Sequence, residues 1–151
     1  MLVKELLHFS PLRLVTVLHD DSIKEAARRM ARFQVGFIVV MDDQDDFVGV
    51  LSERDIVSGM AEPEIIIEEV MVHDLMTESI VNISSDEPLI NAALAMNSQG
   101  IRHLVVTESS KPIGVLSIRD VLRIFASQVL NIEGNADGQF TMDFAKALAA
   151  A

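Results

Sequence analysis

The chain has 151 residues, of which 50% are hydrophobic, with 12 Lys or Arg against 23 Asp or Glu. The formal net charge of −11 repels phosphate backbones and anionic lipids, which argues against nucleic-acid and membrane partners. The absence of cysteine excludes disulfides, thiol nucleophiles and cysteine-ligated zinc. No apolar run approaches the roughly 18 residues of a membrane span, and Lys4 and Glu5 interrupt any signal-peptide core, so we expect a soluble cytoplasmic protein.

The first half of the chain predicts one β-α-β-β-α unit. A short β-type segment at 14–17 is followed by an amphipathic helix, in which the apolar residues of SIKEAARRM are spaced three and four apart. A β-branched strand at 37–41, the acidic turn DDQDD and a second strand at 47–51 come next. A last helix opens at Ser52, a residue type preferred at helix N-caps.

The second half of the chain repeats this unit. PLINAALAM matches SIKEAARRM at its apolar positions, RHLVVT matches GFIVVM, and GVLSIRDVL matches GVLSERDIV. We therefore expect strands at 80–83, 104–107 and 113–116 and a last helix from Ser117. Each small sheet needs another surface to cover it, so the two units should pair around a pseudo-twofold axis in a mixed α/β fold.

The repeated nonapeptide places charged residues at the start of the last helix in each unit. SERD and SIRD both fit a capping box, in which a hydroxyl and a carboxylate three residues later satisfy free backbone N–H groups. Capping alone does not explain Arg54 and Arg119, because a cation in the first turn opposes the helix macrodipole. Backbone N–H groups and a guanidinium together can hold a phosphate, so an anion site stands beside the simple cap as a hypothesis.

In its tandem motifs, the chain resembles a pair of CBS (cystathionine-β-synthase type) domains, the arrangement called a Bateman module. The resemblance covers about residues 8 to 126 and rests on VHDLMTESIVNISSD, GIRHLVV and the G-V-L-S-x-R-D that closes both units. It is carried by the combination in tandem, since no single piece is specific. It implies a first CBS domain at 8–61, a connecting segment at 62–73 and a second domain at 74–126. The C-terminal extension at 127–151 departs from the family, and its residues can form a short helix at 141–151, capped by Thr141.

The resemblance implies regulatory binding of an adenosine-containing ligand, AMP, ADP, ATP or S-adenosylmethionine, in two clefts between the domains. In the family, the Ser-x-x-Asp helix of one unit faces the entry segment and middle strand of the other, and its Asp accepts from the ribose hydroxyls. The first cleft should then combine Asp120, Arg119, Ser117 and Val115 with Val15, Thr16, Val35 and Gly36. The second should combine Asp55, Arg54, Ser52 and Val50 with Thr77, Val81, Ile101 and Arg102.

The two units differ at the start of the middle strand. The second has Arg102 and His103 where the first has Gly36 and Phe37. Arg102 is a candidate for the phosphates, whereas His103 is either a ligand contact or a packed residue of an apolar strand. Because Arg102 is then the mid-strand cation for both clefts, we expect one cleft either to bind more tightly or to take a ligand with fewer phosphates.

The sequence offers no catalytic or metal-binding pattern. Its four histidines lack metal-ligand spacing, and it contains neither a G-x-S-x-G elbow nor a Walker A loop. The acidic turn at 42–46 lacks the glycine and terminal glutamate of an EF-hand loop. We therefore expect a protein without enzymatic activity, catalytic cofactor or metal, and with no attached catalytic domain.

Partners follow from the resemblance rather than from the residues. It implies a homodimer in which four domains form a flat disc, with Ile56, Met60, Leu122 and Phe125 as exposed apolar ridges on the dimer face. A ligand that bridges the two domains would shift the angle between them, and an unidentified protein partner would read that angle. The alternative is an interaction scaffold that dimerises but has weak or vestigial nucleotide sites.

Overall fold

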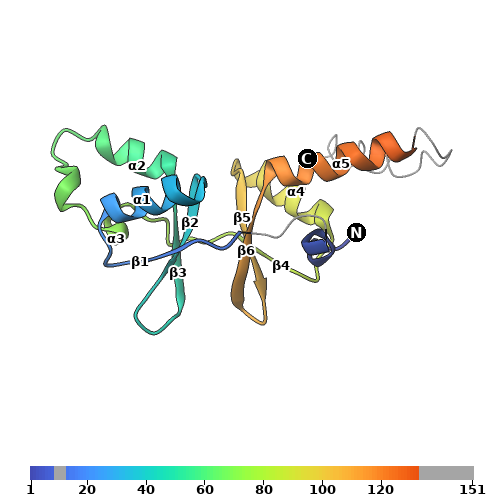
Figure 1. Ribbon diagram of the computed structural model, residues 1–151, viewed down its shortest axis with the longest axis horizontal. Coiled ribbons are helices and arrows are strands. Elements are labelled where there is room, and N and C mark those ends of the chain that lie inside the picture. Colours follow the sequence, from blue (N-terminus) through green and yellow to red (C-terminus); the bar gives the residue numbers. More distant parts are fainter. Residues whose placement is uncertain (9–12, 133–151) are drawn as a thin grey trace.

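Two units of the same topology face each other through their sheets, and their helices lie on the outside (Figure 1). The computed structural model describes residues 1–8 and 13–132, so the short helix expected at 141–151 lies outside the described residues. Among those residues, no helix has the length and apolar character needed to cross a bilayer.

The predicted β-α-β-β-α order is confirmed in both units. The first unit consists of β1 (Thr16–Leu18), α1 (Ile23–Phe33), β2 (Phe37–Met41), β3 (Phe47–Ser52) and α2 (Glu53–Met60). The second consists of β4 (Asn82–Ser84), α4 (Leu89–Gln99), β5 (His103–Glu108), β6 (Lys111–Ser117) and α5 (Ile118–Ile132). In each sheet the first strand runs parallel to the middle strand, and the last strand runs antiparallel to it.

The helix boundaries follow from local side-chain chemistry. The hydroxyl of Ser22 accepts a hydrogen bond from the backbone N–H of Glu25 and caps the start of α1. At the other end, Gln34 takes a left-handed conformation, with φ of 54°, and Gly100 does the same after α4, with φ of 63°. Helices α1 and α4 therefore end in the same tight turn, which leads directly into β2 and β5.

The middle strands are buried on both faces, which explains their continuous apolar sequence. In β2, Ile38 and Val40 pack beneath the helices of the first unit. Val39 and Met41 point the other way and meet Val105 of β5 in a separate core between the two sheets. This central core joins the two units without a helix between them.

Each unit is also tied to the other by its entry segment. Thr77, in the entry to the second unit, forms two backbone hydrogen bonds with Val50 of β3, of 2.8 and 3.0 Å. Reciprocally, the N–H of Val115 in β6 donates to the carbonyl of Arg13, in the entry to the first unit, at 3.2 Å. The exchange gives the pair the pseudo-twofold relationship that the repeat predicted.

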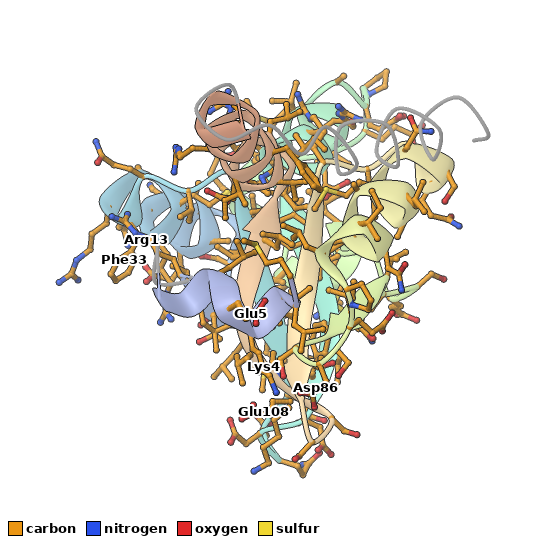
Figure 2. The ribbon with its side chains drawn as sticks, turned by 90° about the vertical axis from the view of Figure 1, so that its right-hand side faces the viewer. Lys4, Glu5, Arg13, Phe33, Asp86 and Glu108 are labelled. Atoms are coloured by element: carbon orange, nitrogen blue, oxygen red, sulfur yellow. The ribbon has the colours of Figure 1, made fainter. Side chains whose placement is uncertain are left out.

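The N-terminal turn belongs to the second unit, although it precedes the first in the chain. In η1 (Val3–His8), Val3 and Leu6 are buried in the core built by α4, β5 and α5. The backbone N–H of Lys4 donates to the carbonyl of Ser85, and its ammonium forms a 2.7 Å ion pair with Asp86, which raises the pKa of Lys4 (Figure 2). Sequence reasoning did not assign this turn to either unit.

Two residues expected on an exposed apolar ridge are instead buried. Ile56 of α2 and Phe125 of α5 belong to the cores of their units, so this part of the prediction is wrong. The spacing of apolar residues predicted a ridge on each helix, but it did not show which residues of the ridge face the sheet. Met60 and Leu122, from the same set, are exposed as predicted.

Between the two units, the chain forms the short elements η2 (Ile67–Glu69) and α3 (Val72–Leu75). Helix α3 extends two residues past the end expected for the connecting segment at 73.

Candidate functional site

A pocket of about 700 Å³ lies between the two units, where β3 and β6 lead into α2 and α5. The structure brings most of the predicted site residues of both clefts to this one pocket, rather than to two separate ones. They are Val35, Gly36, Val50, Ser52, Arg54, Asp55, Thr77, Val81, Ile101, Arg102, His103, Val115, Ser117, Arg119 and Asp120.

Val15 and Thr16 do not line this pocket. They line a smaller neighbouring one of about 400 Å³, and Arg13 lines both. The backbone of this segment is bound within its own unit: the carbonyl of Val15 accepts from the N–H of Val39, and that of Thr16 accepts from the Arg29 guanidinium at 2.8 Å. The sequence predicted a strand here, but it did not show that Val15 and Thr16 lie outside the larger pocket.

The Ser-x-x-Asp motifs form the predicted capping boxes at both helix starts. One carboxylate oxygen of Asp55, Oδ2, accepts from the N–H and hydroxyl of Ser52, at 2.7 and 2.6 Å. Asp120 Oδ2 accepts likewise from Ser117, at 3.1 and 2.5 Å. Capping occupies Oδ2 of each carboxylate, and Oδ1 of Asp120 also lies 3.6 Å from the guanidinium of Arg123. Within the described residues, Oδ1 of Asp55 makes no hydrogen bond or ion pair, so a cap and a hydroxyl-binding group are compatible in this residue.

Three arginines line the pocket without a partner. Within residues 1–8 and 13–132, Arg54, Arg102 and Arg119 make no hydrogen bond or ion pair through their guanidinium groups. In a chain with a net charge of −11, unpaired cations at one pocket favour an anionic ligand there. No group of three or more His, Asp or Glu within the same part of the chain is arranged to hold a metal ion.

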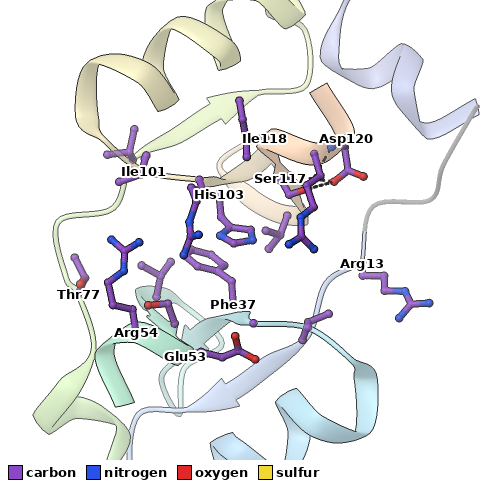
Figure 3. Close-up of a pocket in the computed structure, with 18 of the residues that line it drawn as sticks. Arg13, Phe37, Glu53, Arg54, Thr77, Ile101, His103, Ser117, Ile118 and Asp120 are labelled. Atoms are coloured by element: carbon purple, nitrogen blue, oxygen red, sulfur yellow. Dashed lines mark hydrogen bonds between the residues drawn. The ribbon is translucent and has the colours of Figure 1, made fainter. Parts of the chain in front are cut away.

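The middle of the pocket is occupied by two stacked rings. Phe37 and His103 lie 5.0 Å apart between centroids, with 19° between the ring planes, and separate Arg54 and Thr77 from Ser117 and Asp120 (Figure 3). Burial lowers the pKa of His103, and the positive charge of Arg102 lowers it further. The histidine is thus held in its neutral form in the pocket.

Sequence reasoning missed two charged residues of the pocket. Glu53 reaches back over Gly36, so that a Cβ on that glycine would lie 2.7 Å from the carboxylate Oε2. Arg13 enters from the segment before β1, and its guanidinium donates to the carbonyl of Phe33. The signal for Glu53 was present in the repeat, where Ile118 takes its place, but its direction could not be deduced from the sequence.

Comparison with protein-family models decides the family. The model of the CBS domain matches residues 3–62 and 72–127, which is most of the chain. This chain is a tandem pair of CBS domains. The first of the two matches begins at residue 3 and so includes the N-terminal turn, although the side chains of Val3 and Leu6 are buried in the second unit.

The chain is similar to both curated proteins and solved structures. An uncharacterized 17.7 kDa protein from Acidianus ambivalens is 35% identical over 74% of this chain. The chain spans only 62% and 66% of the length of two of its curated relatives. A CBS-domain containing protein from Agrobacterium tumefaciens has a crystal structure 30% identical in sequence, with a TM-score of 0.75, covering 81% of this chain and 91% of that one.

One of the similar structures was solved with AMP. It is a CBS domain protein from Pyrobaculum aerophilum complexed with AMP, 28% identical, with a TM-score of 0.72. The similarity covers 84% of this chain and 99% of that chain.

In the tandem CBS pair, two backbone N–H groups at the pocket already donate hydrogen bonds within the protein. The N–H of Val35 donates to the carbonyl of Met30, and the N–H of Ile101 donates to that of Met96, both at 3.0 Å. These two bonds close the turns after α1 and α4. A base lying against Val35 or Ile101 can therefore use their carbonyl oxygens as acceptors but not their N–H groups as donors.

Proposed function

We propose that this CBS pair is a non-enzymatic regulatory module that binds an adenosine-containing ligand in the pocket between its domains. The observation that carries the proposal is the convergence of two Ser-x-x-Asp helix starts and three unpaired arginines on one pocket of about 700 Å³. That volume lies within the range of small-molecule sites, and the residues offer acceptors for hydroxyls and cations for phosphates.

The roles of the residues follow from their chemistry. A carboxylate oxygen of Asp55 or Asp120 accepts from the ribose hydroxyls, and the arginines hold the phosphate. The apolar side chains of Val81 and Ile101 cover the base. The similarity to a CBS domain protein complexed with AMP supports this ligand class and makes AMP the first candidate, ahead of ADP, ATP and S-adenosylmethionine.

The signalling mechanism is a population shift. A ligand in this pocket touches both domains, so it stabilises the domain angle at which both sets of contacts are made. In this proposal the first domain spans 8–61 and the second spans 74–126, and residues 62–73 join them. The N-terminal turn packs into the core of the second domain. A protein target that binds the module more tightly at one domain angle than at another would then respond to the presence of the ligand.

We also propose that the module is a homodimer. Val57, Met60 and Leu122 on α2 and α5 are 65%, 60% and 54% exposed, and apolar side chains of this size favour contact with another surface. The same observation supports the alternative function, a dimerisation scaffold whose nucleotide pocket is vestigial. The two functions differ in whether a ligand stabilises the protein.

The test is thermal unfolding of the wild type with AMP, and of Asp55→Ala, Asp120→Ala and Asp74→Ala. Asp74 is the matched control, because its carboxylate accepts from the N–H of Met71 at another helix start, outside the pocket. Each substitution removes the N3 carboxylate of a capping box and lowers stability by itself, so each variant is compared with its own ligand-free midpoint.

AMP at about 100 times its Kd should stabilise the wild type by about 2.7 kcal/mol, or a few degrees. The shift should persist in Asp74→Ala and be lost in at least one pocket variant. No shift with any of the four ligands, in protein stripped of bound nucleotide, would establish the scaffold instead.

A further inference from the structure

The first domain carries a group of arginines at the C-terminal half of α1, outside the pocket between the domains. We call this group the basic patch, and it consists of Arg13, Arg28, Arg29 and Arg32. In a chain with a net charge of −11, four of the 12 basic residues therefore lie on or beside one helix. The carboxylate of Glu25 pairs with Arg28 and Arg29 and compensates part of this charge.

The domain fold itself does not require these cations. The second unit has the same topology, and α4, the counterpart of α1, contains no charged residue. The helix macrodipole favours a cation in the last turn, which accounts for Arg32 but not for the other three. The repeat has uncharged residues at the four corresponding positions, namely Ser79, Leu94, Ala95 and Ser98. The basic patch is thus a feature of the first domain and not of the repeat.

An apolar hollow opens within the basic patch. It is the smaller pocket of about 400 Å³, lined by Arg13, Leu14, Val15, Thr16, Arg29 and Phe33. Leu14 and Phe33 are 39% and 43% exposed, so apolar surface faces solvent between the two guanidinium groups. Arg13 and Phe33 lie next to each other on the outside of the molecule (Figure 2). The guanidinium of Arg32 lies 5.5 Å from the centroid of the Phe33 ring.

The two guanidinium groups that line this pocket are held in place by the fold. Arg13 donates to the carbonyl of Phe33 at 2.8 Å, and Arg29 donates to the carbonyl of Thr16 at 2.8 Å and to Glu25 at 3.2 Å. A guanidinium has five N–H donors, so both side chains keep donors for another acceptor. Because their positions are already fixed, binding a carboxylate there loses little side-chain freedom.

We propose that the basic patch is a docking surface for an acidic segment of a protein partner. An apolar side chain of the partner enters the pocket between Leu14 and Phe33, and neighbouring carboxylates bind the arginines. Arginine and aromatic residues are enriched where proteins bind one another, which favours a protein segment over a small anion. The proposal deepens the regulatory function and rests on it, because it identifies the surface that the protein target would bind.

Arg13 connects this surface to the pocket between the domains. Its backbone carbonyl accepts from the N–H of Val115 in the second domain, whereas its side chain is bonded to the first. It also lines both pockets. A ligand that changes the angle between the domains therefore acts on a residue of the docking surface itself.

NMR titration of the full-length protein with two synthetic peptides tests the proposal. One peptide has glutamates around a single leucine, and the other has lysines around the same leucine. The glutamate peptide should shift the backbone amides of Leu14, Thr16 and Phe33, and high salt should weaken its binding. The amides at the corresponding positions of the second domain, Ile80, Asn82 and Gln99, should not shift. The lysine peptide should shift neither set.

Two variants test the named residues. Phe33→Ser and Arg32→Gln should each weaken the glutamate peptide about tenfold, and Lys24→Gln, at the other end of α1, is the control that removes the same charge. Circular dichroism establishes that each variant is folded. AMP binding should be unchanged in all three, because none of these residues lines the pocket between the domains.

The outcomes separate the docking surface from the nucleotide function. No shift with the glutamate peptide at millimolar concentration, or equal affinities for the wild type and both patch variants, would overturn the docking surface while AMP still binds. N-acetylglutamate binding as tightly as the peptide would mean a small-anion site instead. A fall in mass from two chains to one in Phe33→Ser would mean that a second copy covers the patch. Absence of AMP binding, with the peptide shifts intact, would remove the nucleotide function alone.

Discussion

The phenyl ring of Phe37 stacks on the imidazole of His103, and the two residues hold equivalent positions as the first residues of β2 and β5. The stack therefore lies on the pseudo-twofold axis that relates the domains. A neutral imidazole suits this position, because protonation would place a charge in a partly buried site beside the positive charges of Arg102 and Arg119.

The first prediction concerns the pH dependence of stability. Burial, Arg102 and Arg119 lower the pKa of His103 from 6.5, and Asp120 and Glu53 oppose them only in part. Below pH 6.5 the unfolded chain binds more protons at this histidine than the folded protein does. The free energy of unfolding should therefore fall as the pH drops from 6.5 through the lowered pKa of the folded state.

Denaturant unfolding of wild type and His103→Phe across this range measures the effect. The substitution keeps the ring and removes the titration, and all other groups titrate in both proteins. The wild type should lose more stability on acidification than the variant does. Parallel pH profiles would show that His103 is not held neutral by the fold.

The second prediction assigns the phosphate contact. Arg102→Gln should weaken AMP binding about ten- to 100-fold, because hydrogen bonds to charged groups contribute about 1.5 to 3 kcal/mol. Arg32→Gln is the matched control: Arg32 is on α1, where its guanidinium lies 5.5 Å from the ring of Phe33, and it does not line the pocket. Equal affinities for the two variants, measured by titration calorimetry, would contradict the assignment.

The third prediction concerns the N-terminal turn. Leu6→Ala should destabilise the protein by about 2 to 5 kcal/mol, as expected for a leucine buried in a core. Lys4→Ala removes an exposed, solvent-screened ion pair from the same turn and should cost much less than Leu6→Ala. Chemical denaturation of both variants is the measurement, and similar small effects would mean that the turn is only loosely attached.

The fourth prediction concerns assembly. Wild-type protein should have the mass of two chains in light scattering, and Met60→Glu with Leu122→Glu should reduce it to one, because carboxylates would be desolvated in an apolar interface. Phe33→Glu, at another exposed apolar residue, should leave the dimer intact. A wild type with the mass of one chain, at concentrations well above micromolar, would refute the dimer.

Much of the fold follows from local patterns in the sequence. The strand Phe37–Met41 and the helix starts at Ser52 and Ser117 agree with the structure, because β-branched runs and N-caps act over a few residues. Strand ends were less accurate: the segment expected at 14–17 forms a strand only at Thr16–Leu18. That boundary depends on pairing with β2, which is a long-range interaction.

The remaining differences depend on packing between distant parts of the chain. The resemblance implied two clefts, and residues of both line one continuous pocket that the Phe37 and His103 rings divide. The burial of Leu6 in the second core could not be read from an N-terminal sequence that precedes the first domain. The carboxylate of Glu53 lies where a side chain of residue 36 would begin, and this placement could not be deduced from the sequence. The repeat showed only that Glu53 in one copy is replaced by Ile118 in the other.

A crystal structure of the protein with AMP tests the central claim most directly. The account predicts one AMP between the two domains, with its ribose hydroxyls at Asp55 and its phosphate at Arg54 and Arg102. It also predicts that the stack of Phe37 and His103 remains beside the ligand. AMP bound outside this pocket, or an empty pocket in crystals grown at saturating AMP, would contradict it.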